Sequence, residues 1–115
     1  MTDEQSLSGK TIKAAFSSLT NFACEFDDGS GLLLQASEGP TPRIDGNLVE
    51  ANALPRDNDA VCRVDWSWII GSKINRAKLT DSAAQLQLDK AGPLTISVQM
   101  WQGKPFLAFQ PFRPA

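Results

Sequence analysis

The sequence predicts a mainly β fold, all-β or α+β with at most one or two short helices, in a single domain over residues 1–115. Two hairpin patterns predict strands, because each places apolar side chains at every second position on both sides of a turn. The pattern also returns after 62 residues (71 minus 9). A chain of this length supports one core. We therefore expect two similar β-meander halves, approximately 7–49 and 69–112, to share that core as a sheet or a partly closed barrel.

The repeat is visible as identical residues at matching positions without a gap. The identical pairs are Gly9 and Gly71, Ile12 and Ile74, Ala15 and Ala77, Asp27 and Asp89, and Leu32 and Leu94. Alternating strands also match one another by their period alone. We favour an internal duplication, and a coincidence of period is the alternative.

Residues 9–16 alternate as a strand does, with Ile12 and Phe16 on the same face. They also fit the apolar face of a helix, because positions three and four apart are apolar too. We favour a strand, since the matching segment 72–79 fits a helix less well.

The first hairpin pattern follows directly. Phe22, Cys24 and Phe26 share one face of a half-buried strand. Residues 27–31 are rich in Asp and Gly, which favour turns, and 32–36 form the returning strand.

The middle of the chain lacks a regular pattern. Prolines at 40 and 42 break the preceding strand, and 43–49 is interpreted as a turn centred on Asp45 and Gly46. Residues 51–60, which contain a proline and a polar run, are the expected linker between the halves.

Residues 61–68 are interpreted as a strand, with Cys62, Val64, Trp66 and Trp68 on one face. A short helix is the alternative, because Asp59 could cap its start and Gly71 could end it. Whether the tryptophans at 66, 68 and 101 belong to the core or the surface stays open on sequence alone.

The second hairpin pattern is the clearest in the chain. The alternating apolar residues are Ala84, Leu86 and Leu88 before the bend at 90–93, and Leu94, Ile96, Val98 and Met100 after it. A further turn at 102–105 leads into the apolar segment 106–109.

Composition narrows the function classes. The chain has no His and no Tyr, and it has no spaced Cys cluster and no Gly-rich phosphate loop. We therefore expect no metal, no cofactor and no catalytic residue. The net charge of −2 comes without a basic patch, so nucleic acid is not an expected partner.

The chain is expected to be cytoplasmic. No uninterrupted apolar run approaches the roughly 20 residues that span a bilayer, so no membrane association is expected. The first five residues lack the basic and apolar regions of a secretory signal. Cys24 and Cys62 are expected to be reduced.

Several residues could carry chemistry, but a structural role explains each of them better. Asp27 and Asp28, like Asp57 and Asp59, could form a carboxylate pair, although such residues usually form solvated turns. The serines at 17 and 18, and Cys62 beside Arg63, lack a histidine as general base. The prediction leans towards a protein that is not an enzyme.

A surface around Trp101 is the candidate binding site. On the alternation of 94–101, the Trp101 indole lies opposite the core-facing residues. The site is predicted to comprise Trp101, Gln99, Lys104, Phe106 and Phe109, because an aromatic patch with a polar rim is typical of protein contacts. We expect a protein partner or self-association as a homodimer. The alternative places Trp101 in the core.

The frame Leu7-x-Gly9-x-x-Ile12, followed by a hairpin, returns as Ile69-x-Gly71-x-x-Ile74. In this frame the chain resembles small two-repeat bacterial proteins of uncharacterised function. The second copy departs from it, since residues 90–93 replace the acidic Gly-rich turn. The resemblance implies no catalytic residues, and some small acidic bacterial proteins of this size are similar to immunity proteins that cap a toxin.

These observations together predict a non-catalytic protein-binding or structural domain. An immunity-like protein is one alternative. A small carboxylate-based enzyme or a small-ligand-binding protein is the other.

Overall fold

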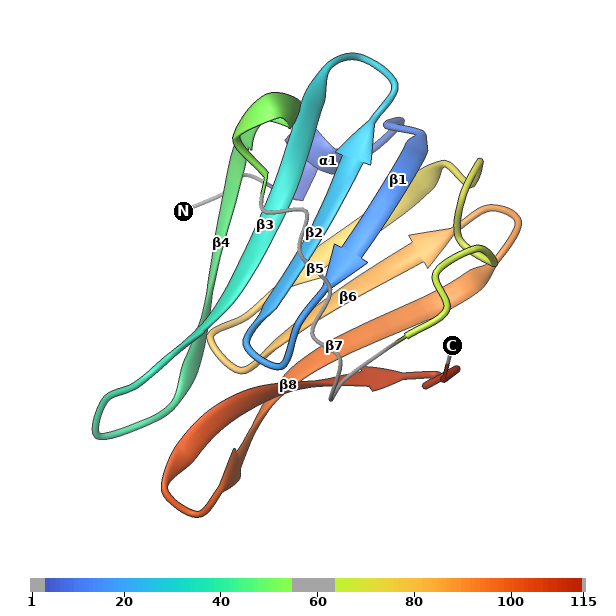
Figure 1. The fold of residues 1–115 in the computed structure, drawn as a ribbon. Coiled ribbons are helices and arrows are strands. Elements are labelled where there is room, and N and C mark those ends of the chain that lie inside the picture. The colour runs from blue at the N-terminus through green and yellow to red at the C-terminus, as the bar shows by residue number, and fades with distance from the viewer. Residues whose placement is uncertain (1–3, 55–63, 115) are drawn as a thin grey trace.

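The computed structural model describes residues 4–54 and 64–114 and confirms a mainly β fold. The described residues form two four-stranded antiparallel sheets that do not close into a barrel, and Figure 1 shows them as two layers. The first sheet contains β1 (Ile12–Ser17), β2 (Asn21–Phe26), β3 (Ser30–Ser37) and β4 (Arg43–Glu50). The second contains β5 (Ile74–Leu79), β6 (Ala83–Leu88), β7 (Gly92–Trp101) and β8 (Lys104–Gln110). A short helix, α1 (Glu4–Leu7), precedes β1, and a 3-10 turn, η1 (Ala51–Ala53), follows β4.

The two sheets are similar in detail. Strands β5 and β6 begin and end 62 residues after β1 and β2 (74 minus 12, and 83 minus 21). Each sheet also carries an irregularity in its first pair of strands, between Ile12 and Ala14 and again between Ile74 and Arg76. The expected linker at 51–60 begins with η1, and 55–60 lie outside the described residues.

One core lies between the sheets and draws on both of them. Its largest fully buried side chains are Leu7, Ile12, Phe22, Phe26, Leu32, Leu34, Ile69, Ile74, Leu86, Leu94, Ile96 and Leu107. Leu7 and Ile69, which precede the first strand of each sheet, are equivalent under the 62-residue offset. Each meander alone would expose an apolar face. The two meanders therefore pack with these faces against each other.

A short antiparallel ladder between 9–12 and 71–74 joins the two halves. Its bonds run from Gly9 N to Ile74 O (2.7 Å), from Gly71 N to Ile12 O (2.8 Å), from Ile12 N to Ser72 O (2.9 Å) and from Ile74 N to Lys10 O (2.9 Å). When 62 is added to the residue numbers below 13 and subtracted from those above 70, the first bond becomes the second and the third becomes the fourth. The two halves are thus related by an approximate twofold axis beside the Thr11–Lys73 bridge.

Because of the irregularity in β1, the side-chain alternation predicted for this strand is wrong after Ile12. Ile12 faces the core as predicted, but the register then slips by one residue, so Ser17 is buried and Phe16 is only half-buried. A bulge of this kind bends the strand and reverses the phase of the residues that follow it. This bend lets one strand pair with β2 after it has left the ladder to the other half.

The interpretation of 43–49 as a turn is wrong. These residues lie within β4, which pairs with β3 without interruption from Ser30↔Glu50 to Ser37↔Arg43. The chain already reverses at 38–42, where the two prolines lie. Gly46 leaves room for Leu34 across the strands, since a Cβ at position 46 would lie only 3.0 Å from Cδ2 of Leu34.

Neither a strand nor a helix forms in the described part of 61–68. Residues 61–63 lie outside the described residues, Val64 makes an isolated bridge to Pro114, and 67–71 form turns. Trp66 is nevertheless buried, because its ring packs edge-on at 5.0 Å against both Phe22 and Phe109. The segment is thus fixed by the packing of Trp66 together with a short backbone pairing, in which Asp65 N donates a hydrogen bond of 2.8 Å to Arg113 O.

We expect Trp66→Ala to lower the free energy of unfolding by about 3–5 kcal/mol, because it empties a buried aromatic site. The indole Nε1 also donates a hydrogen bond to Ser17 Oγ at 2.9 Å, which the variant loses. The matched variant is Trp101→Ala, for which we expect a loss of no more than about 0.5 kcal/mol, typical of an exposed site. Urea denaturation followed by circular dichroism measures both. Equal losses would contradict the assignment of Trp66 to the core and Trp101 to the surface.

Candidate functional site

The β7–β8 hairpin extends further than its counterpart in the first sheet. The pair Gln99↔Phe106 corresponds to the last pair of the β3–β4 hairpin, Ser37↔Arg43, and two more pairs follow it in β7–β8. The hairpin closes through Gln102 (φ 49°) and Gly103 (φ 78°). Two successive residues with positive φ are typical of a tight two-residue turn that matches the twist of the strands. The end of this hairpin lies beyond the region that the core requires.

Four of the five predicted site residues share the outer face of this hairpin. Trp101 is opposite Lys104, and Gln99 is opposite Phe106, so their side chains lie on one face of the antiparallel pair. The Trp101 side chain is 68% exposed, which settles its position in favour of the surface. Met100, on the opposite face, is also exposed, although the sequence pattern placed it with the core.

Phe109 is the exception, and its expected place beside the Trp101 indole is wrong. Alternation along β8 directs Pro105, Leu107 and Phe109 inwards and Phe106 outwards. Phe109 is buried against Trp66 and Phe22, so it belongs to the core.

A hollow of about 270 Å³ adjoins the exposed indole. It is lined by Leu19, Trp101, Gln102, Lys104, Pro105 and Phe106. Leu19 comes from the β1–β2 turn of the other sheet, and its carbonyl accepts a hydrogen bond of 2.8 Å from Leu107 N. Sequence reasoning missed Leu19. An exposed apolar residue in a short polar turn was the available signal, but its spatial neighbours are distant in the chain.

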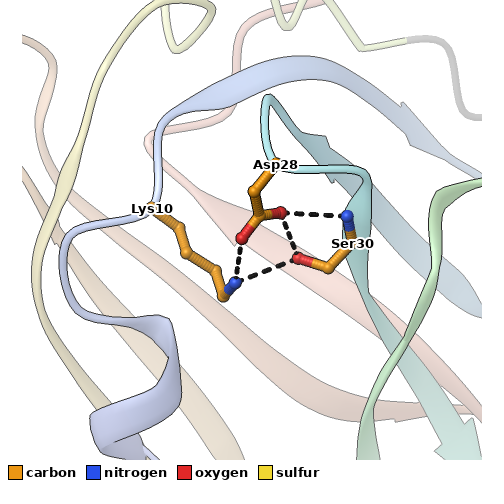
Figure 2. Close-up of polar contacts among 3 residues, drawn as sticks. All are labelled: Lys10, Asp28 and Ser30. Carbon is orange, nitrogen blue, oxygen red and sulfur yellow. Dashed lines mark hydrogen bonds and ion pairs between the residues drawn. The ribbon is translucent and has the colours of Figure 1, made fainter.

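A polar cluster at the start of β1 is the strongest alternative site (Figure 2). The Lys10 ammonium group contacts the Asp28 carboxylate and donates a hydrogen bond of 3.0 Å to Ser30 Oγ. Asp28 Oδ1 also accepts hydrogen bonds from Ser30 Oγ (2.5 Å) and Ser30 N (2.9 Å). The hydrogen bond from Lys10, followed by those from Ser30, holds the pKa of Asp28 well below its usual range.

The arrangement of this cluster does not activate the Ser30 hydroxyl. A nucleophilic serine needs a neighbouring base that takes its proton. The Asp28 carboxylate is a weak base because its pKa is depressed, and the Lys10 ammonium group acts as a donor to both partners. The cluster instead ties the β2–β3 turn to the start of β1. The equivalent positions in the second half are Ser72, Lys90 and Gly92, which cannot form it.

The other candidates for chemistry have structural roles or lie outside the described residues. Ser17 accepts the hydrogen bond of the Trp66 indole. Cys24 is a free thiol within the core, and burial raises its pKa to about 12, with an opposing effect from a hydrogen bond with the Leu32 backbone. Cys62 and the pair Asp57 and Asp59 lie outside the described residues.

Over 4–54 and 64–114, no three His, Cys, Asp or Glu side chains gather where they could hold a metal ion. No helix in these same ranges is long and apolar enough to cross a membrane.

Comparisons with protein-family models, with curated proteins and with solved structures found no match.

We expect the contribution of Asp28 to stability to depend on pH. Its folded pKa lies below the unfolded value of about 3.9, so the contribution is complete above about pH 4. It is lost as the pH falls through the folded pKa. The difference in unfolding free energy between wild type and Asp28→Asn should thus be constant from about pH 7 to 5 and shrink at lower pH.

Urea denaturation at a series of pH values measures this difference. The control repeats the comparison in a Lys10→Met background, where the carboxylate has lost its main partner and the difference should be smaller. A difference between wild type and Asp28→Asn that stays the same down to about pH 2 would contradict the role of the ionised carboxylate.

Proposed function

We propose that this protein is a non-catalytic binding domain that contacts a protein partner through the outer face of the β7–β8 hairpin. The hairpin surface consists of Gln99, Trp101, Lys104 and Phe106, with Leu19 beside it. The observation that carries the proposal is the exposure of the Trp101 indole on a hairpin that extends beyond its counterpart.

The chemistry of the hairpin surface supports a protein partner. Tryptophan is among the residues that contribute most to the binding energy of protein interfaces, because binding removes much of the apolar surface of its large ring from contact with water. Lys104 and Gln99 supply polar groups beside it, as the rim of such an interface does. The adjoining hollow of about 270 Å³ is lined largely by apolar side chains, among them Leu19 and Phe106, and can receive an apolar side chain of the partner.

Site-specific photo-crosslinking tests the proposal. A benzoylphenylalanine at position 101 should form a covalent adduct with the partner when cells that express the chain are irradiated, because the ring is buried by the partner. Mass spectrometry then identifies the protein in the adduct.

The matched control carries the same crosslinker at position 70. Ile70 is also exposed, at 43%, but it does not line the hollow beside Trp101. An adduct formed from position 101 and not from position 70 supports the proposal. A failure of position 101 to capture any chain above the level of position 70 would overturn it.

A further inference from the structure

The strands of the two sheets carry charges of different sign. The strands of the first sheet carry the acidic residues Glu25, Asp45 and Glu50 and the basic residues Lys13 and Arg43. The strands of the second sheet carry the basic residues Arg76, Lys78 and Lys104 and contain no Asp or Glu. The whole chain has a net charge of −2, so the second sheet departs from the acidic balance of the rest.

The basic residues of the first sheet are already paired within that sheet. Lys13 Nζ lies 3.4 Å from a carboxylate oxygen of Glu25, and Arg43 Nε lies 3.6 Å from Asp45 Oδ1. Over the ranges 4–54 and 64–114, no carboxylate forms an ion pair with the basic residues of the second sheet. These positive charges are therefore free to pair with a partner.

The basic residues of the second sheet share its outer face with the hairpin surface. Lys78 is opposite Gln85 and Gln85 is opposite Thr95, so a row of side chains crosses from β5 to β7. Strand β7 continues from Thr95 to Trp101 without a bulge, and side chains two residues apart lie on the same face. Lys104, across from Trp101, completes this face on β8.

A partner that covers Trp101 needs more surface than one ring supplies. A tryptophan side chain buries about 150–250 Å², whereas a stable interface buries about 800 Å² on each partner. The outer face continues from Trp101 along β7 to Thr95, over about 20 Å (101 minus 95 residues at about 3.3 Å each). It is exposed at Gln85, Gln99 and Gln110 as well. The face therefore offers a continuous extension of the hairpin surface.

A hollow of about 530 Å³ lies at the β5–β6 end of this face. It is lined by Asn75, Arg76, Lys78, Gln85 and Gln87. Every one of these side chains carries N–H donors, from a guanidinium, an ammonium or an amide group. A guanidinium group can bind both oxygens of a carboxylate, and hydrogen bonds between charged groups are the stronger ones. The hollow therefore suits the carboxylates of a partner.

We propose that the protein that binds the hairpin surface carries an acidic segment, which crosses the outer face of β5–β8 and pairs its carboxylates with Arg76 and Lys78. The inference rests on the proposed function and names the chemistry of the partner. Complementary charges across such an interface speed association and disfavour basic partners, because like charges that meet there repel each other.

A single-stranded nucleic acid is another polyanion that a basic face with aromatic rings can bind. Surfaces of that kind place several rings along the path of the strand, so that successive bases stack on them. Here both rings of the face, Trp101 and Phe106, lie at the β7–β8 end, and amide and hydroxyl side chains lie between them and β5. The net charge of −2 also repels a phosphate backbone. An acidic protein segment is therefore the favoured occupant.

Photo-crosslinking from the middle of the face tests where the partner lies. A benzoylphenylalanine at position 85 should capture the same protein as one at position 101. The matched control is position 47, because Asn47 is exposed and its cross-strand partner Leu33 alternates with the core residues on β3, which places it on the outer face of the first sheet. Capture from position 101 but not from position 85 above the level of position 47 overturns the inference, and so does an adduct with nucleic acid at position 85.

Charge reversal tests the acidic nature of the partner. Arg76→Glu/Lys78→Glu should lower the adduct yield from position 101 at least about tenfold, because like charges then meet across the interface. The neutral variant Arg76→Gln/Lys78→Gln should lower the yield less. Circular dichroism checks that each variant is folded.

The matched control for charge reversal is Lys13→Glu/Arg43→Glu, which makes the same change in net charge on the first sheet. Both side chains are largely exposed, at 65% and 62%, so the loss of their surface ion pairs should cost little stability. The adduct yield from position 101 should stay within about twofold of the wild-type yield.

The two proposals fail differently. Equal yields from the two charge-reversal variants would overturn the acidic partner and leave the hairpin surface in place. No protein adduct from position 101 would remove the hairpin surface and the inference built on it.

Discussion

The ladder between 9–12 and 71–74 is the constraint on which the rest of the structure depends. Each of these segments leads directly into the first strand of one sheet, so four backbone hydrogen bonds place the sheets relative to each other. Lys10 takes part in this ladder and also links it to a turn of the first sheet. Its carbonyl accepts a bond from Ile74 N, and its ammonium group binds Asp28 in the β2–β3 turn.

The equivalent bulges at the start of β1 and β5 make the ladder compatible with two packed sheets. Without a bend, a strand that pairs with the other half would continue in that direction and lose its partner in its own sheet. The slip after Ile12 and after Ile74 turns both strands towards their own meanders. Leu7 and Ile69 then enter the core from equivalent positions just before the ladder.

The two halves have similar backbones and differ in the side chains that pack between their strands. Phe22 and Phe109 surround Trp66 in one half, whereas two small residues, Ala84 and Gly46, occupy the equivalent positions in the other. The second half also extends its last hairpin and places Trp101 on the outside. The hairpin surface proposed to bind therefore lies where the halves differ, because the parts that they share are used in packing the core.

The sequence by itself determined the strands whose patterns are local. Alternation predicted β2, β6 and the core contacts of Leu94, Ile96 and Val98 in β7, and it placed Trp101 opposite Ile96, because successive side chains of any strand point to opposite faces. It could not determine β4, whose Gly46 suggests a turn until Leu34 is seen across from it. Only the tertiary structure decided which face of each strand lies against the other sheet and which segments adjoin it. It thereby buried Phe109 and brought Leu19 beside the indole, since these outcomes depend on contacts between residues that are far apart in the chain.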